Sequence, residues 1–324
     1  MLVTGSDAMI TSAKESIAGE GPPESSDAHL RAIVGNRRWI AALDQWYRAG
    51  GRPNDTARAQ LDLNAHSWQE LQVHLCGTGW FTSARGTIRP TVKGEDFLTR
   101  VNELYRATLR DNLEDRGVAE VLAGLPRGAA VDIGCGPGYS ALRLSRLGFT
   151  PLYAYDLSPV AIAIARALLD NEGGTAELHA RSATYLLEIE NASLALIFSR
   201  GALHYFKQTD LARTVRRTLR PGGYLVAEIY GLRYYLQSKH LRRLLSSRWW
   251  RQVVSYARTI LRTLIYEAFK LQPRFAAGAP EIGYSVGSIG RLARWAGLEV
   301  LSIAPAPSLV GYLVVMRKPL EDAR

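Results

Sequence analysis

The stretch VDIGCGPGYS, residues 131–140, places an acidic residue and three glycines at alternate positions behind a short apolar run. Asp132, Gly134, Gly136 and Gly138 form the pattern DxGxGxG. Glycines let a backbone approach a ligand closely, and a strand, a glycine-rich loop and a helix together present main-chain amides to it. Such a loop could hold a dinucleotide, a phosphate group or another nucleoside.

The spacing of the glycines distinguishes these ligands. The dinucleotide pattern GxGxxG, started at Gly134, requires a glycine at position 139, where the chain has Tyr139. The phosphate-binding pattern GxxxxGK[ST] is also absent. The loop therefore departs from both patterns.

Two further features follow the loop in order. Asp156 ends the apolar run in YAYDLS, 20 residues after Gly136, and a carboxylate there can accept hydrogen bonds from both ribose hydroxyls. The alternative role for Asp156 is to cap a helix that begins after Ser158. The segment LRPGGYLVAE, residues 219–228, makes a turn into a later apolar run.

These three features resemble class I S-adenosylmethionine-dependent methyltransferases over residues 115–318. The resemblance implies an α/β fold with a Rossmann-like seven-stranded sheet, S-adenosyl-L-methionine as cofactor and S-adenosyl-L-homocysteine as product. It assigns Asp132 and the loop amides to the amino-acid end of the cofactor, and Asp156 to the ribose. The cofactor-binding residues that it implies are Asp132, Gly134, Cys135, Gly136, Gly138, Tyr139, Asp156, Leu157, Ser182, Ala183 and Ser199.

The adenine end of the expected site departs from the family pattern. Related enzymes often carry an acidic residue after the third strand, whereas this chain reads HARSATYL there. Ser182 and the backbone of Ala183 are therefore the expected adenine contacts.

The fourth expected strand leads into FSRGALHYF, residues 198–206, which supplies a candidate catalytic group. His204 has an ordinary pKa of about 6.5, which suits a general base. The alternative is packing or contact with the cofactor loop, as histidines here often provide in related enzymes. Lesser candidates for the base are Tyr205, Arg200, Glu228 and Tyr230, whose alternative role is to form a pocket wall or to pack.

From Ala129 onward, strand and helix patterns alternate, which predicts a mostly parallel sheet with ligands at the carboxyl ends of its strands. A basic insert interrupts this order at residues 233–280. From Arg233 to Arg274 it contains ten Lys and Arg residues against one acid, Glu267, and its periodicity predicts an amphipathic helical pair. Its interpretations are a lid with a solvated basic face, a selector of anionic acceptors, or a contact with membrane or nucleic acid.

The chain before the glycine loop divides into a tail and a domain. Residues 1–28 are rich in Ser, Gly, Pro and Glu, which predicts a disordered tail. Residues 29–112 predict a winged-helix-like domain, before a methyltransferase domain at 113–324. The predicted elements of the winged-helix-like domain are a helix over 29–47, a short helix over 57–63, a helix capped by Ser67, a hairpin turning at 84–86 and a helix from Phe97.

The predicted recognition helix, SWQELQVHLCGTGW, contains no Lys or Arg, which argues against nucleic-acid binding by this domain. The domain instead resembles the dimerisation domain of small-molecule O-methyltransferases, which implies a homodimer.

Composition limits the remaining possibilities. The six histidines show no metal-binding spacing, so no metal is expected. Two distant cysteines and the lack of a 20-residue apolar run predict a cytoplasmic protein with reduced thiols. The expected function is methyl transfer to a small molecule, such as an anionic or aromatic intermediate of natural-product biosynthesis. The alternatives are a methyltransferase for peptides or nucleic acid, and a non-catalytic cofactor-binding regulator.

Overall fold

The computed structural model describes residues 24–48, 63, 65–84, 87–113, 116–184, 186, 188–236, 249–270, 282–306 and 310–320. The chain divides into two compact units, Met1–Thr99 and Arg100–Arg324. The division falls inside one long helix, α6 (Val92–Leu113), rather than at residue 112.

The first unit contains helices and one hairpin. Its elements are α2 (Glu24–Gly35), α3 (Arg37–Arg48), α5 (Ala65–Gly77), β1 (Phe81–Ala84), β2 (Thr87–Pro90) and the start of α6. The strands β1 and β2 pair antiparallel, which confirms the predicted hairpin. The predicted helix over 57–63 falls outside the described residues except for Leu63.

The first predicted helix and the tail were wrong in their limits. α2 already begins at Glu24, inside the predicted tail, and the helix predicted over 29–47 is broken at Asn36. The Asn36 side-chain oxygen accepts hydrogen bonds from the backbone amides of Arg38 and Trp39, at 3.1 and 3.2 Å. A side chain that caps a new helix in this way ends the preceding one.

The predicted cap at Ser67 was also wrong. α5 begins two residues earlier, at Ala65, so Ser67 lies inside the helix. Its hydroxyl accepts a hydrogen bond of 3.0 Å from the indole nitrogen of Trp39. Ser67 therefore joins two helices rather than starting one.

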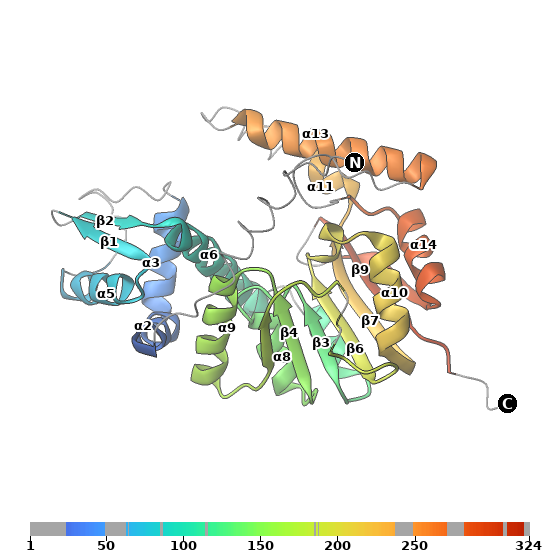
Figure 1. Ribbon diagram of the computed structural model, residues 1–324, viewed down its shortest axis with the longest axis horizontal. Helices are drawn as coiled ribbons and strands as arrows, with labels where there is room; N and C mark the ends of the chain where they lie inside the picture. Colours follow the sequence, from blue (N-terminus) through green and yellow to red (C-terminus); the bar gives the residue numbers. More distant parts are fainter. Residues whose placement is uncertain are drawn as a thin grey trace, which may run out of the picture. The chain divides into compact units, whose positions relative to one another are not determined.

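The second unit is built on a seven-stranded sheet, which confirms the predicted fold (Figure 1). The strand order is β5-β4-β3-β6-β7-β9-β8, and only β9 runs against its neighbours. The strands are β3 (Ala130–Ile133), β4 (Leu152–Asp156), β5 (Glu177–Ala180), β6 (Leu194–Arg200), β7 (Leu219–Tyr230), β8 (Glu299–Pro305) and β9 (Gly311–Arg317).

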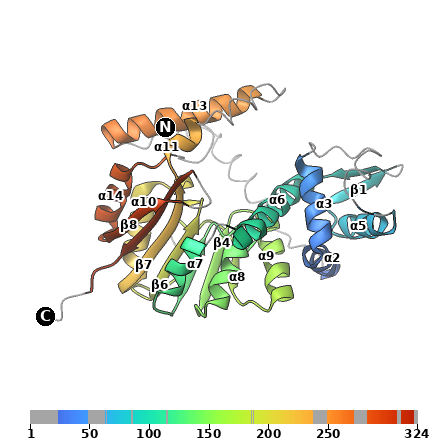
Figure 2. The ribbon, with the colours of Figure 1, turned by 180° about the vertical axis from the view of Figure 1, so that it is seen from behind.

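Helices cover both faces of this sheet (Figures 1 and 2). They are α7 (Arg116–Ala123), α8 (Tyr139–Arg146), α9 (Pro159–Glu172), α10 (Gln208–Thr218) and α14 (Val286–Ala296). Val131 of β3 packs in one core cluster with Leu211 of α10 and Leu292 of α14. The next residue back, Ala130, packs in the other cluster with Leu144 of α8. The alternation of side chains along β3 thus supplies both cores.

The strand β7 begins before the Pro-Gly-Gly segment, which was predicted to form a turn ahead of it. It starts at Leu219 and includes the Pro-Gly-Gly segment, because a register shift against β6 absorbs the extra residues. Gly222 within the shift has a φ of 73°. A bulge of this kind bends the strand without ending it.

Two helices of the predicted insert are described, α11 (Leu232–Leu236) and α13 (Trp249–Phe269). The rest of the insert, at 237–248 and 271–280, lies outside the described residues. In the described part of the chain, no helix has both the length and the hydropathy needed to cross a membrane.

Candidate functional site

The glycine-rich loop joins the end of β3 to the start of α8, with all three glycines at positive φ: 72°, 53° and 87° for Gly134, Gly136 and Gly138. A Cβ atom on Gly134 would lie 2.2 Å from the Cβ of Ala202, and one on Gly138 would lie 2.6 Å from the Cβ of Ala165. Packing therefore requires both outer glycines.

The middle glycine is different. A Cβ atom on Gly136 would meet one atom within 4 Å, Oε2 of Glu103 on α6, at 3.6 Å. Its positive φ favours glycine, but nothing else described crowds it. The loop is thus open to a ligand at its centre, and Glu103, which no sequence motif marked, stands beside this opening.

Asp156, at the end of β4, holds the loop through both carboxylate oxygens. Oδ2 accepts a 3.0 Å hydrogen bond from the Gly136 amide, and Oδ1 accepts one of 2.9 Å from the Ser158 amide. The cap of α9 is Ser158 itself, whose hydroxyl accepts from the Ala161 amide at 3.0 Å. Each Asp156 oxygen retains a second lone pair for a ribose hydroxyl.

Asp132, on β3, is a fully buried carboxylate beneath the loop. Neither of its oxygens has a hydrogen-bond partner among the described residues. Burial, followed by repulsion from Asp156, raises its pKa to about 8, against the opposing effect of Arg200. A buried carboxylate of this kind fits the ammonium group of a ligand.

The strand ends next to Asp132 carry further buried charge. Arg200 on β6 lies opposite Glu228 on β7, with Nε 2.7 Å from Oε2, and Glu228 is fully buried. On α8, burial and the nearby Arg200 lower the pKa of Arg143 to about 10. Sequence reasoning missed Arg143, although it stands one helical turn beyond Tyr139 at the start of α8.

Two more of the expected cofactor residues lie in or just after the loop. Cys135 is buried, and burial, with Asp132 and Asp156, raises the pKa of its thiol. Tyr139 is the first residue of α8, and the Arg143 guanidinium lies 5.9 Å from its ring.

Ser199 is held away from solvent. It is fully buried on β6, and its hydroxyl donates a 2.8 Å hydrogen bond to the carbonyl of Ile133 at the end of β3. Its side chain therefore fixes the two strand ends that carry the loop.

The expected adenine contacts lie at the neighbouring strand ends. Leu157, directly after Asp156, is 73% exposed, whereas Ala183 is buried. The Ser182 hydroxyl lies 2.6 Å from the Thr184 hydroxyl and accepts from its amide at 3.2 Å. Ser182 thus forms a local turn.

A carboxylate does approach this end of the sheet, from a residue that the sequence reasoning missed. The Tyr155 hydroxyl donates a hydrogen bond to Glu188, which also pairs with Arg181 at 2.6 Å. Tyr155 directly precedes Asp156 on β4. Glu188 has no fixed sequence spacing to the glycine-rich loop. It lies outside regular secondary structure and contacts Tyr155 through the folding of the chain.

His204 lies in the short 3-10 helix η1 (Leu203–Tyr205) and is 2% exposed. Its ring centre is 3.8 Å from that of Tyr205 and 5.1 Å from that of Tyr230. Burial lowers its pKa to about 3, so the ordinary value assumed from the sequence was wrong. The imidazole is neutral at physiological pH and is a weaker proton acceptor than a free one.

Among the described residues, no group of three or more His, Cys, Asp or Glu side chains is arranged to hold a metal ion.

Residues 130–223 match the family model of a methyltransferase domain. The chain therefore contains a methyltransferase domain. The matched segment contains the glycine-rich loop, Asp156 and His204. No curated protein matches the chain in sequence.

Several solved structures are similar to this methyltransferase. One is an S-adenosylmethionine-dependent methyltransferase from Aquifex aeolicus, with 17% identity, a TM-score of 0.42 and coverage of 64% of this chain and 90% of that one. Another is geranyl diphosphate C-methyltransferase from Streptomyces coelicolor, with 15% identity, a TM-score of 0.43 and coverage of 67% and 81%. Sequence identities and TM-scores this low do not identify the methyl acceptor of this chain.

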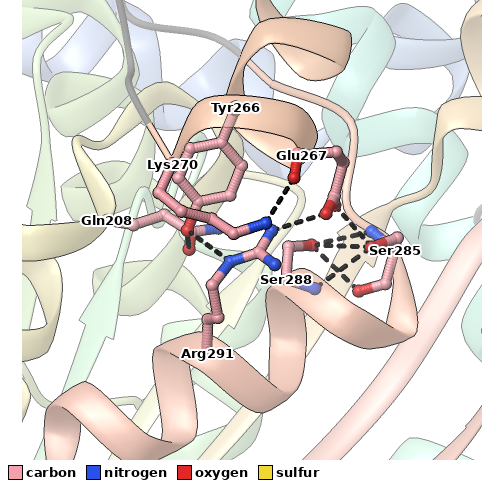
Figure 3. Close-up of polar contacts among 7 residues, drawn as sticks. All are labelled: Gln208, Tyr266, Glu267, Lys270, Ser285, Ser288 and Arg291. Carbon is pink, nitrogen blue, oxygen red and sulfur yellow. Dashed lines mark hydrogen bonds and ion pairs between the residues drawn. The ribbon is translucent and has the colours of Figure 1, made fainter.

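The helix α13 of the methyltransferase is fixed at its end by a polar network (Figure 3). Glu267 accepts hydrogen bonds from Arg291 of α14, at 2.6 Å, and from the Ser285 hydroxyl, at 2.5 Å. The Tyr266 hydroxyl donates to the side chain of Gln208 on α10. Burial alone would raise the pKa of Glu267, but the bonds from Arg291 and Ser285 hold it below its ordinary value.

The face of α13 that turns inward carries three polar residues beside the buried Tyr266. Thr259, Arg262 and Thr263 are 1%, 4% and 1% exposed. The Thr263 hydroxyl accepts a 2.9 Å hydrogen bond from the Gly283 amide, and the preceding amide, of Ile282, donates to the carbonyl of His204 at 3.2 Å. This face is thus linked to the segment that carries His204. The predicted solvated basic face was wrong at Arg262.

Proposed function

We propose that this methyltransferase acts on a small-molecule acceptor that carries a carboxylate or phosphate group, such as an aromatic intermediate of a biosynthetic reaction sequence. The observation that carries this proposal is Arg262, a buried cation on the inward face of α13. Guanidinium groups bind carboxylates and phosphates in a fixed, two-pronged geometry and are more weakly hydrated than ammonium groups, which suits a buried site.

The position of this cation supports an acceptor site. Arg262 shares its helix face with Thr259 and Thr263, and Thr263 is connected through the 282–283 backbone to His204. Ligands of doubly wound sheets bind outside the carboxyl ends of the strands, where this segment lies. An anion held by Arg262 would place the rest of the acceptor near the strand ends.

Aromatic side chains favour an aromatic acceptor. Tyr205, beside His204, is 51% exposed. The Tyr230 ring lies 5.1 Å from the His204 ring and 4.3 Å from the Tyr234 ring. Offset stacking against such rings orients a planar acceptor.

The proposed cofactor is S-adenosylmethionine, and each strand end has one role in binding it. Asp132 holds the cofactor ammonium and Asp156 holds the ribose hydroxyls. The amides of the loop, with Cys135 and Tyr139, surround the methionine part. Leu157, Ser182 and Ala183 surround the adenine, and Ser199 fixes the strand ends beneath it.

The reaction itself requires alignment more than acid or base chemistry. S-adenosylmethionine, held by Asp132, Asp156 and the loop amides, would supply its methyl group to a lone pair of the acceptor, and its sulfonium sulfur would keep the electrons of the broken carbon–sulfur bond. Holding the two groups in line supplies several kcal/mol of the barrier. His204, neutral throughout the physiological range, is proposed to accept the hydrogen bond of an acceptor hydroxyl and then its proton.

Two further parts of the proposal concern the whole protein. The helices and hairpin of the first unit support a winged-helix-like dimerisation domain and hence a homodimer. Light scattering that gives only monomer over a concentration series would refute the dimer. A cytoplasmic location is proposed from Cys76 and Cys135, both of which are free thiols.

The acceptor class is tested by measuring S-adenosylhomocysteine formation with aromatic acids and with their neutral methyl esters. We expect the acids to be methylated in preference. Arg262→Gln should raise the KM for an acid at least about tenfold and leave that for an ester nearly unchanged, because a bidentate charged contact is lost. Arg258→Gln, an exposed arginine on the same helix, is the matched control.

Three results would contradict the proposal. Equal use of acids and esters would remove anion selection. Transfer only to peptides or nucleic acid would replace the acceptor class. Tight S-adenosylhomocysteine binding with no transfer in a broad acceptor panel would favour the non-catalytic regulator.

A further inference from the structure

The helix α13 places leucines on its exposed side and polar residues beside Tyr266 on its buried side. The residues of its outward stripe, Ala257, Leu261, Leu264 and Ala268, recur at spacings of four, three and four. All four are exposed, with Leu261 and Leu264 at 49% and 53%. The polar residues Thr259, Arg262 and Thr263 lie on the buried side.

A second helix of the same unit shows the ordinary arrangement. On α10 the apolar residues Leu211, Ala212 and Val215 are buried, while Arg213 and Arg216 are exposed. Burial of apolar surface is the main favourable contribution to folding, so an exposed leucine stripe gains nothing in water. A contiguous apolar stripe bordered by charge marks an interaction surface.

The charge around the stripe identifies its partner. Residues 233–274 contain ten Lys and Arg residues and one acid, and Arg258 and Lys270 are exposed on α13 or directly after it. Pairing of two copies through this stripe would bring two such segments together, and like charges repel. An anionic surface would instead neutralise them.

We propose that the outward stripe of α13 binds the surface of an anionic lipid bilayer. The helix would lie in the plane of the interface, with Leu261, Leu264 and Phe269, which is 70% exposed, among the acyl chains. Exposed cations near the surface would add attraction to the anionic lipids. The inward polar face and its contacts with α10 and α14 would remain as they are.

The proposal is tested by flotation of the full chain with vesicles of phosphatidylcholine alone or with about 30% phosphatidylglycerol, since anionic lipid supplies the attracting charge. We expect flotation only with the anionic vesicles, and its loss at about 0.5 M salt, where screening is strong. Leu261→Ser combined with Leu264→Ser should weaken binding at least about tenfold, because the variant loses two leucine side chains that would be buried among the acyl chains.

Two matched controls keep the result specific. Val73→Ser with Leu320→Ser removes two exposed apolar side chains from elsewhere and should float like the wild type. Arg258→Gln should reduce flotation, whereas Arg213→Gln on α10 should not. Calorimetry with S-adenosylhomocysteine should give the same affinity for the leucine double variant and the wild type, which separates this test from the proposed function.

Absence of flotation at low salt, or equal flotation of the leucine double variant, would overturn the proposal. A wild-type dimer that the leucine double variant converts to a monomer would also overturn it, because a second copy would then cover the stripe.

Discussion

The glycine-rich loop and the helix α13 differ in what determines their geometry. In the loop, packing requires Gly134 and Gly138, and a carboxylate from the next strand holds the middle amide, so a few residues at fixed spacing determine the geometry. In α13, no motif is present, and the roles proposed for this helix depend on which face turns inward. The comparison shows why the cofactor could be read from the sequence and the acceptor could not.

The largest effect is expected from substitutions within the loop itself. Gly138→Ala should lower the free energy of unfolding by about 2–4 kcal/mol, through strain at positive φ and the clash with Ala165. Gly136→Ala should cost only about 1–2 kcal/mol but weaken S-adenosylhomocysteine binding at least about tenfold, because its side chain enters the open side of the loop. Denaturant unfolding and calorimetry measure the two quantities. Equal effects on stability would contradict this distinction.

The next effect concerns turnover at His204. His204→Gln should lower kcat about 10²-fold if the imidazole takes the proton. Because burial lowers the pKa of His204 to about 3, activity of the wild type should not fall through this group between pH 7 and 5. A titration near pH 6.5 that disappears in His204→Gln would show that the ring is more solvated than described. Near-normal turnover of the variant would assign His204 to packing.

A third prediction concerns the buried carboxylate beneath the loop. In the folded protein the pKa of Asp132 is about 8, above its ordinary value of about 4, so its contribution to stability is present below pH 4 and is lost as the pH rises to 8. Asp132→Asn should therefore raise the Tm of the cofactor-free protein at pH 8.5 and have little effect at pH 4. Its affinity for S-adenosylhomocysteine should fall. A variant that is less stable at pH 8.5 would refute this account.

The smallest effect is expected at the end of α13. Glu267→Gln should reduce the free energy of unfolding by about 1–2 kcal/mol, because the charged bond from Arg291 becomes a neutral one. S-adenosylhomocysteine binding should be unchanged, since the network in Figure 3 joins α13 to α10 and α14. Thermal unfolding and calorimetry check both parts. A loss of cofactor affinity would mean that α13 and the loop are coupled.

Features that depend on local spacing could be predicted from the sequence. The strands of the sheet, the loop and Asp156 follow from apolar periodicity and from a fixed distance along the chain. The break at Asn36 could not be predicted, because the apolar periodicity continues across it while a side chain caps the next helix. Ser67 was assigned to a cap because its indole partner, Trp39, lies 28 residues away.

Two of the site residues that were missed, Glu103 and Glu188, are brought in from a distance by the fold. Glu103 comes from α6 and Glu188 from a loop, and neither has a fixed spacing to Gly136 or Asp156. The pKa of His204 depends on burial, which no single residue type reveals. The amphipathic pattern of α13 was visible, but the sequence contains no sign of which face is buried.

The central claim is that the loop and Asp156 together hold the cofactor. Titration calorimetry of S-adenosylhomocysteine into the wild type, Asp156→Asn and the control Asp170→Asn, an exposed carboxylate on α9, tests it most directly. We predict one site in the wild type and the control, and an affinity at least about 10²-fold lower in Asp156→Asn, because two charged hydrogen bonds to the ribose and the one to Gly136 weaken. Equal affinity in all three proteins, or no binding to the wild type, would contradict it.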